Sequence, residues 1–339
     1  MRVFVTGGSG FLGGYLIPRL VAQGYEVVAL ARSDAAHKQV EKLGAIGVRG
    51  DLTDVESLKR GVQGCDVVVH GAAAFEMWGD ESWFYTMNVQ GTDNLLLAAQ
   101  HNTVRRFIYI SAASVVSNPQ GAHLVDETYQ PAQPPQDAYS RTKRMAEQHM
   151  LAANSPHLTT LALRPPLIWG QGHSMSAAMR EAVDQGRWVW IGGGRHLLAT
   201  VHVENLCAAV IASLQKGRGG EVYYITDGET RTVRQFLTAW MNADGVQPGA
   251  RSVPRWMAAL SAAVLARLWR MLGLRTTPPL TPSMVAMLGT ELSMTDQKAR
   301  RELEYTNVLS IDEGLRLLRA AQPDDSTAHS RPTLTTVNL

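Results

Sequence analysis

Hydrophobic residues follow two alternating spacings along the first 165 residues of the chain. Short apolar runs, typical of buried strands, lie at 2–6, 26–31, 46–49, 66–69, 106–111 and 159–164. Between them, apolar residues recur three and four positions apart, which predicts helices at 11–23, 35–43, 54–61, 81–101 and 138–153. Repeated strand–helix units predict an α/β fold with a doubly wound parallel sheet that is covered by helices on both faces.

The pattern changes after Arg164. Pro165 and Pro166 end the last of these strands, and glycine-rich pieces separate shorter elements further along the chain. We therefore expect one domain at 1–165 and a smaller C-terminal substrate-binding lobe at 166–320, with some of its segments returning to the sheet. Residues 321–339 are rich in Pro, Ser, Thr and Asp, a composition that predicts a disordered tail.

Composition and charge narrow the functions that the chain can have. With 339 residues, 45% of them hydrophobic, the chain can bury a large core. The formal net charge is +2 and Lys and Arg form no stripe, which argues against a nucleic-acid partner. Cys65 and Cys207 stand outside any Cys/His array, so we expect no metal site and a reducing, cytoplasmic location.

A glycine-rich turn, Thr6-Gly7-Gly8-Ser9-Gly10-Phe11-Leu12-Gly13, joins the first strand to the first helix. A backbone without side chains lets a pyrophosphate approach closely, and the start of a helix offers free N–H donors. The turn predicts a Rossmann dinucleotide site, and the alternative is a tight turn without a ligand. The expected contacts of the cofactor in this turn are Gly7, Ser9, Gly10, Phe11 and Leu12.

The ends of the next three strands bear on the choice of cofactor. Arg32 and Ser33 follow the second strand and match a 2′-phosphate, so we expect NADP; NAD stays possible because Asp34 is one residue further on. After the third strand, Asp51 could accept from the adenine amino group, with Leu52 beside it, or could cap the next helix. The small residues Ala72 and Ala73 suit a backbone that touches the cofactor, whereas we expect His70 to be a packed strand-end histidine.

Tyr139 and Lys143 lie four residues apart, so on a helix both side chains share one face. A free tyrosine has a pKa near ~10 and exchanges protons poorly at neutral pH. A neighbouring ammonium lowers the pKa of a phenol, which could then pass a proton to or from a ketone or alcohol while hydride moves to or from a nicotinamide. A surface helix pair without such chemistry is the alternative.

These segments come in the order typical of one enzyme superfamily. TGGSGFLG at 6–13, HGAA at 70–73, NVQGT at 88–92, YSRTK at 139–143 and LRPPLIWG at 163–170 resemble the extended short-chain dehydrogenase/reductases over residues 1 to about 320. The chain is most similar to the 3β-hydroxysteroid dehydrogenase branch, including sterol dehydrogenases and 2-alkyl-3-ketoalkanoate reductases.

The resemblance implies roles for individual residues. It assigns Tyr139 as the acid/base and Lys143 as its partner and a ligand of the nicotinamide ribose. Asn88 would hold a helix bend and a proton-relay water. The backbone of Pro166, Leu167 and Ile168 would contact the carboxamide of the cofactor.

One position departs from the family pattern. The family places Ser or Thr where this chain has Ala112, and the neighbouring Ser111 is expected to point to the opposite face of the strand. Ser114 would return to the first face if the strand end stays extended, so we expect Ser114 to supply the missing donor to the substrate oxygen. If neither serine reaches the substrate, Tyr139 works alone.

The second lobe is rich in Trp, Met and Leu, which fits a core or, collectively, an apolar pocket for a sterol or β-keto lipid; among these residues are Trp169, Met175, Met179, Trp188, Trp190, Trp256, Met257, Leu260 and Met271. The predicted function is an oxidoreductase that interconverts a ketone and a secondary alcohol on such a substrate. The alternatives are a nucleotide-sugar epimerase or dehydratase of the same fold and a non-catalytic, cofactor-binding scaffold, which the loss of the family's hydroxyl at Ala112 invites.

Two segments suggest contacts with partners. Residues 256–274 form the most apolar segment, but only the eleven residues 256–266 separate Arg255 from Arg267, short of the ~20 that span a bilayer. We expect an amphipathic helix over a substrate pocket or a helix in peripheral contact with a membrane. The predicted helices 81–101 and 138–153 suggest a homodimer through leucines and methionines, namely Leu95, Leu96, Leu97, Met145, Met150 and Leu151.

Overall fold

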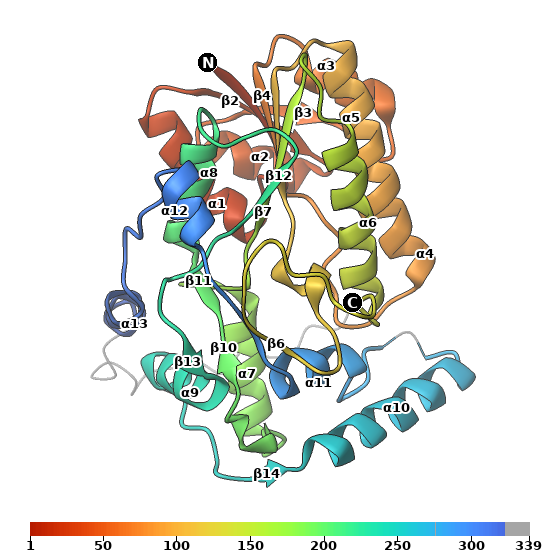
Figure 1. Ribbon diagram of the computed structural model, residues 1–339, viewed down its shortest axis with the longest axis vertical. Helices are drawn as coiled ribbons and strands as arrows, with labels where there is room; N and C mark the ends of the chain where they lie inside the picture. Colours follow the sequence, from red (N-terminus) through yellow and green to blue (C-terminus); the bar gives the residue numbers. More distant parts are fainter. Residues whose placement is uncertain (275, 323–339) are drawn as a thin grey trace, which may run out of the picture.

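A seven-stranded parallel sheet forms the centre of the molecule, in the order β12-β7-β5-β4-β1-β2-β3 (Figure 1). The computed structural model describes residues 1–274 and 276–322. The strands are β1 (Arg2–Thr6), β2 (Glu26–Ala31), β3 (Ile46–Arg49), β4 (Val67–His70), β5 (Arg106–Ile110), β7 (Thr159–Arg164) and β12 (Glu221–Tyr224). All neighbouring pairs are parallel, and the strand order is that of a Rossmann fold, so the predicted fold is confirmed.

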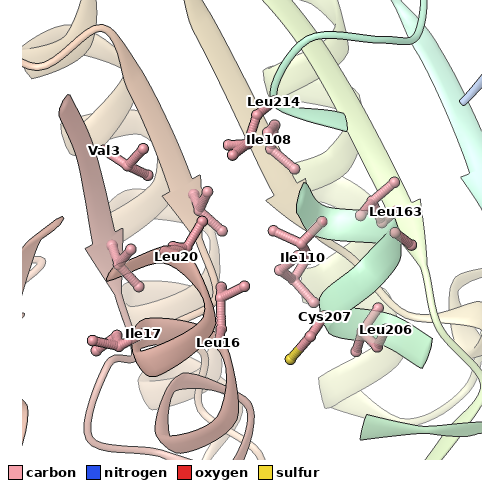
Figure 2. Packing of buried hydrophobic residues seen from close by; sticks show 14 of the residues in the cluster. Val3, Leu16, Ile17, Leu20, Ile108, Ile110, Leu163, Leu206, Cys207 and Leu214 are labelled. Atoms are coloured by element: carbon pink, nitrogen blue, oxygen red, sulfur yellow. The ribbon is translucent and has the colours of Figure 1, made fainter. Parts of the chain in front are cut away.

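Helices cover both faces of this sheet because each turns an apolar stripe toward it. One face carries α1 (Phe11–Ala22), α2 (Asp34–Lys42) and α8 (Val203–Ser213). The other carries α3 (Val55–Val62), α5 (Gly91–His101) and α6 (Ala138–Ala152). Figure 2 shows the first face, where side chains of α1 and α8 pack against the strands, among them Leu16, Ile17, Leu20, Leu206 and Cys207.

The helix predicted at 81–101 contains a change of winding. It begins as α4 (Glu81–Phe84), continues as a π-helical segment, η1 (Tyr85–Gln90), and ends as α5. A π-helical turn widens the helix and commonly marks a functional position. Asn88 lies in this turn and is fully buried.

The chain beyond residue 165 builds a second layer of structure and also returns to the large sheet through β12 and α8. Its strands are β8 (Leu167–Trp169), β9 (Trp190–Ile191), β10 (Leu197–Leu198), β11 (Thr200–His202), β13 (Arg231–Thr232), β14 (Ser252–Val253) and β15 (Leu292–Met294). Its remaining helices are α7 (Ser174–Asp184), α9 (Val233–Ala243), α10 (Arg255–Met271), α11 (Pro282–Gly289), α12 (Gln297–Glu302) and α13 (Ile311–Ala320), with the short 3-10 helix η3 (Gly192–Gly194). β6 (Ala122–Val125) joins β13, β10 and β15 in a four-stranded sheet.

The tryptophans and methionines of this region divide into two groups. Trp169, Trp190 and Met179 are buried in a core cluster that α9 and α13 complete. In contrast, Trp256, Met257, Leu260 and Met271 lie exposed on α10. The first group therefore matches the expected core, whereas the second faces away from the protein; the apolar substrate pocket stays a prediction.

Both cysteines are buried, and burial raises the pKa of Cys65 to about 11 and that of Cys207 to about 12. Among the described residues no group of His, Cys, Asp and Glu is arranged to hold a metal ion. Within residues 1–274 and 276–322, no helix has both the length and the apolar character needed to cross a bilayer. The tail predicted at 321–339 lies, from residue 323 onward, outside the described residues.

Candidate active site

The predicted cofactor residues gather at one edge of the large sheet. The glycine turn follows β1, Arg32 follows β2, Asp51 follows β3 and Ala72 follows β4. Because these strands are parallel and adjacent, their carboxyl ends meet, which is where open α/β sheets bind ligands. The segment 166–168 belongs to the same edge, since it directly follows β7.

The glycine turn requires glycine at two positions, because the protein's own backbone leaves no room for a side chain there. Gly7 has φ of 75°, and a Cβ there would lie 2.8 Å from the backbone nitrogen of Ala72. At Gly13 a Cβ would lie 2.4 Å from the Gly8 carbonyl oxygen, so the helix sits tightly on the strand. The N-cap residue of α1, Gly10, provides no side-chain cap, which leaves N–H donors of the first turn for an anion.

In the loops after β2 and β3, some side chains are bound to neighbouring protein groups and others are free to bind a nucleotide. Ser33 caps α2, since its hydroxyl accepts from the Ala36 backbone nitrogen at 3.2 Å. Asp34 forms an ion pair with Arg49 at the end of β3, whereas Arg32 is exposed and pairs with no described acidic group. Of the two nearby charges, the cation is therefore the one available to a ligand.

Asp51 does not cap the helix that follows it. The cap of α3 is Asp54, which accepts from the Ser57 backbone nitrogen at 3.1 Å. Asp51 Oδ1 instead accepts from the backbone and hydroxyl of Thr53, at 2.9 and 2.7 Å. The side chain of Leu52 is buried in the core, so only its backbone faces the sheet edge.

Tyr139 lies in the first turn of α6, half-buried, with its ring against that of Phe75 at 5.1 Å between centroids. Asp137 caps the helix by accepting from the Ser140 backbone nitrogen at 2.8 Å. Burial, with a smaller contribution from Asp137, raises the pKa of Tyr139. This direction is opposite to the one expected from the sequence, and at neutral pH the phenol holds its proton.

Lys143 explains this difference, because its ammonium is directed elsewhere. Lys143 is 2% exposed, and its Nζ donates to the Ile110 carbonyl at 2.6 Å and lies 4.0 Å from the centre of the Tyr109 ring. Burial lowers the pKa of Lys143 to about 7, although the charge of Glu147 opposes this change. α6 thus buries Lys143, whose lowered pKa leaves the side chain only partly protonated at neutral pH.

A chain of hydrogen bonds that the sequence pattern did not predict connects the start of the glycine turn to α6. The Ala72 N–H donates to Thr6 Oγ1 at 3.1 Å, and Thr6 Oγ1 lies 2.7 Å from His70 Nδ1. His70 Nε2 lies 2.9 Å from Thr92 Oγ1, which donates to the Asn88 carbonyl. These partners assign the ring proton to Nε2.

Asn88 completes this connection. Its Oδ1 accepts from the Ala74 backbone nitrogen at 2.8 Å, and its Nδ2 donates to Thr142 Oγ1 at 3.0 Å. Thr142 in turn donates to the Ala138 carbonyl, one residue before Tyr139. Burial lowers the pKa of His70 to about 3, so this histidine is neutral and structural, as expected. The chain from Thr6 to Thr142 is called the buried relay below.

Comparison with protein families agrees with this geometry. Residues 4–255 match the model of the 3-beta hydroxysteroid dehydrogenase/isomerase family. The chain belongs to this family. The resemblance inferred from the sequence is thereby confirmed, and the chain is an NAD(P)-dependent dehydrogenase/reductase.

Two relatives match along nearly their whole length. The chain is 38% identical over 324 residues to 4-hydroxy-2-methyl-3-oxo-4-farnesyl-3,4-dihydroquinoline-1-oxide ketoreductase from Stigmatella aurantiaca, covering 95% of this chain and 97% of the relative. It is 35% identical over 331 residues to 2-alkyl-3-oxoalkanoate reductase from Stenotrophomonas maltophilia, covering 95% and 99%.

Solved structures match in fold. The UDP-glucose 4-epimerase of Thermus thermophilus, solved in complex with NAD, superposes with a TM-score of 0.73 at 22% identity, covering 94% of this chain and 98% of the other. This likeness extends to the fold alone, so it gives the epimerase alternative no support beyond a shared architecture.

Ser111, the neighbour of Ala112, does not replace the hydroxyl that the family places at position 112. Ser111 is buried and donates to Glu147 Oε2 at 2.6 Å, while Glu147 also binds Arg164 through two bonds of 2.6 and 2.9 Å. Ser111 therefore belongs to a buried ion-pair cluster behind the site. Its hydroxyl is bound to Glu147.

Ser114 is placed differently from its predicted geometry. β5 ends at Ile110 and residues 113–116 form a 3-10 turn, η2 (Ala113–Val116), so the strand end does not stay extended. The turn nevertheless brings Ser114 Oγ to 2.9 Å from the hydroxyl of Ser140, the residue that follows Tyr139 in α6, where Ser140 donates and Ser114 accepts. The hydroxyl of Ser114 donates to no described residue.

Proposed function

We propose that this enzyme reduces a ketone on a large hydrophobic molecule, a β-keto lipid or a sterol, to a secondary alcohol with NADP(H). The observation that carries the proposal is the position of Tyr139, half-buried beside Phe75 and one residue from the Ser114–Ser140 pair. Burial keeps its phenol protonated, which is the form that donates in a reduction.

The residues at the sheet edge have distinct tasks in this reaction. The glycine turn and the start of α1 hold the pyrophosphate, and the backbone of 166–168 lies where it can orient the nicotinamide, which supplies the hydride when bound. Ser114 donates a hydrogen bond to the ketone oxygen. Tyr139 gives that oxygen a proton as the carbonyl carbon gains hydride, and it regains a proton from solvent.

Arg32 favours NADP over NAD. Its guanidinium is exposed at the end of β2, while the competing carboxylate of Asp34 is paired with Arg49. A free guanidinium binds a 2′-phosphate through two hydrogen bonds. We expect Arg32→Ala to raise the KM for NADPH about tenfold, the effect of losing ~1.4 kcal/mol, and to leave the KM for NADH nearly unchanged; equal effects on both would contradict the NADP preference.

A hydrophobic substrate is supported by Phe75 and by the names of the relatives. Phe75 is 58% exposed and packs on the catalytic ring, so an apolar surface borders the proton donor. Both relatives are named as reductases of 3-oxo compounds that carry a farnesyl or alkyl chain. Of three scattered arginines that a sugar diphosphate could use, Arg180, Arg187 and Arg195, two are engaged separately: Arg187 pairs with Glu181 and Arg180 donates to the Asp244 carbonyl.

The decisive experiment follows NADPH absorbance with a panel of β-keto esters, 2-alkyl-3-oxoalkanoates and ketosteroids. We expect turnover with at least one of them, and Tyr139→Phe should lose on the order of 10³-fold in kcat, as for a lost general acid. Tyr305→Phe is the control, because its hydroxyl donates to the Thr226 carbonyl and takes no part in the proposed chemistry. NADPH binding without consumption of any ketone would favour the scaffold alternative, and interconversion of a UDP-sugar would favour the epimerase.

We also propose a homodimer through α5 and α6. Of the residues expected there, Leu95, Leu96 and Met150 are buried in the core, whereas Leu97 and Met145 are exposed by 56% and 37%. Sedimentation of the wild type and Leu97→Arg tests this assembly: a dimer that dissociates in the variant supports it, and a monomeric wild type contradicts it.

A further inference from the structure

Helix α10 exposes large apolar side chains and buries small ones. Ala258, Ala262 and Ala266 face the protein, where the first two pack with Ile191 and with Val285 of α11. On the other side, the exposed fraction is 68% for Trp256, 60% for Leu260 and 79% for Met271. Val264 and Leu268 continue this stripe at four-residue spacing, so the exposed apolar face runs along most of the helix.

The segment of the chain that contains this helix carries charge of one sign. From residue 245 to residue 290 the sequence contains no Asp or Glu but five arginines, at 251, 255, 267, 270 and 275. Arg267 is exposed and forms no ion pair with any described residue. In Figure 1, α10 lies at the lower right margin of the molecule, with α11 between it and the strand β6. Within its own segment the apolar stripe is therefore flanked only by cations. The neighbouring loop, whose Trp78 lies under Arg270, carries the exposed acids Glu76 and Asp80.

We propose that α10 docks the enzyme on an anionic lipid bilayer, with the Trp256–Leu260–Leu268 face inserted among the acyl chains and the arginines at the headgroups. A helix that lies in an interface combines an apolar face, aromatic residues and basic residues in this way. The positive charge of the segment 245–290 favours an anionic surface, and a helix of 17 residues interrupted by arginines cannot cross the bilayer.

The same helix touches the loop that borders the active site. Arg270 lies over the ring of Trp78, with its guanidinium carbon 5.2 Å from the ring centre. Trp78 and Phe75 belong to the loop between β4 and α4, and Phe75 packs on Tyr139. A docked α10 would thus place the loop beside the membrane, and a lipid substrate could pass from bilayer to site along it. This route rests on the proposed function, whereas the docking itself does not.

Vesicle flotation of the full chain tests the docking without any measurement of activity. We expect binding to vesicles of phosphatidylcholine and phosphatidylglycerol, little binding to pure phosphatidylcholine, and release in high salt. The double variant Trp256→Ser, Leu260→Ser should bind at least tenfold more weakly. Arg267→Gln should bind about fivefold more weakly, the equivalent of ~1 kcal/mol for one basic residue at such a surface.

A matched control is available on another exposed helix. Leu317 on α13 is 51% exposed, and Leu317→Ser removes a similar apolar group from a different side of the protein, so its binding should equal that of the wild type. Circular dichroism and reduction of a water-soluble ketone would verify that the α10 variants stay folded. A wild type that ignores anionic vesicles, or a double variant that binds as the wild type does, would overturn the proposal. So would self-association without lipid that the double variant abolishes, since α10 would then bind a second copy of the chain.

Discussion

Helices α6 and α10 are similar in length, with 15 and 17 residues, but they bury opposite kinds of side chain. α6 turns Lys143 and Glu147 into the protein, each 2% exposed, whereas α10 turns only alanines inward and leaves Trp256 and Leu260 outside. Burying charge and exposing apolar surface both cost free energy. Each helix therefore departs from the ordinary pattern: α6 buries charged groups in the turns that follow Tyr139, and α10 leaves apolar groups on the face proposed to meet a lipid surface.

The largest expected effect on stability comes from the charges that α6 buries. Glu147→Gln leaves Arg164 buried without its carboxylate and should lower the free energy of unfolding by about 3–5 kcal/mol. Urea unfolding followed by circular dichroism measures this change. Glu181→Gln, which removes an exposed pair with Arg187, should change the free energy of unfolding little. Similar losses in the two variants would show that the buried ion pair of α6 contributes no more to stability than an exposed one.

Ser114→Ala tests the chemical side of α6. Loss of a hydrogen bond to the developing oxyanion should reduce kcat on the order of 10²-fold, or ~3 kcal/mol. Ser111→Ala should instead keep most of the activity and lose about 1 kcal/mol of stability, since its hydroxyl binds Glu147. The opposite ranking of kcat in the two variants would move the donor role to Ser111.

Lys143 gives α6 a pH dependence with a definite sign. Its pKa is lowered to about 7 in the folded protein, so between pH 7 and about 10 the unfolded chain binds more protons than the native one. The free energy of unfolding contributed by this group should therefore rise with pH across that window, by up to ~1.4 kcal/mol per pH unit, and be flat below pH 7. Lys143→Met, compared with the wild type from pH 6 to pH 9, should lack this rise; parallel curves would contradict a buried lysine.

The smallest effect is expected at α10. Trp256→Ser and Leu268→Ser should change the free energy of unfolding by no more than ~0.5 kcal/mol, as surface substitutions do, because the two residues are exposed by 68% and 44%. Thermal unfolding in buffer without lipid measures this. A large loss would mean that the apolar face packs against the protein itself.

The fold and the placement of the cofactor residues could be predicted from the sequence because both depend on local patterns. Strand runs and helical spacings each span a few residues, and parallel strands then bring the glycine turn, Arg32 and Asp51 to one edge. Of two carboxylates before α3, however, the sequence did not identify Asp54 as the cap in place of Asp51.

Features that depend on distant contacts were missed or mispredicted. His70 binds Thr6 across 64 residues of sequence, and Ser114 reaches Ser140 only because a 3-10 turn replaces the expected strand. The direction of the pKa shift of Tyr139 was wrong because the position of the Lys143 ammonium, bound to the Ile110 carbonyl, is not encoded in the i, i+4 spacing. For α10, periodicity predicts a helix with two apolar sides but not which of them the protein covers.

The buried relay has a consequence for redesign of the enzyme. It begins at Thr6 and ends at Thr142, and neither Arg32 nor Ser33 takes part in it. A laboratory that wishes to exchange one coenzyme for the other can therefore rebuild the turn after β2 while the scaffold that aims the proton donor stays as it is. Natural substitutions after β2 could likewise change the preference for one coenzyme without altering the residues that hold α6 in place.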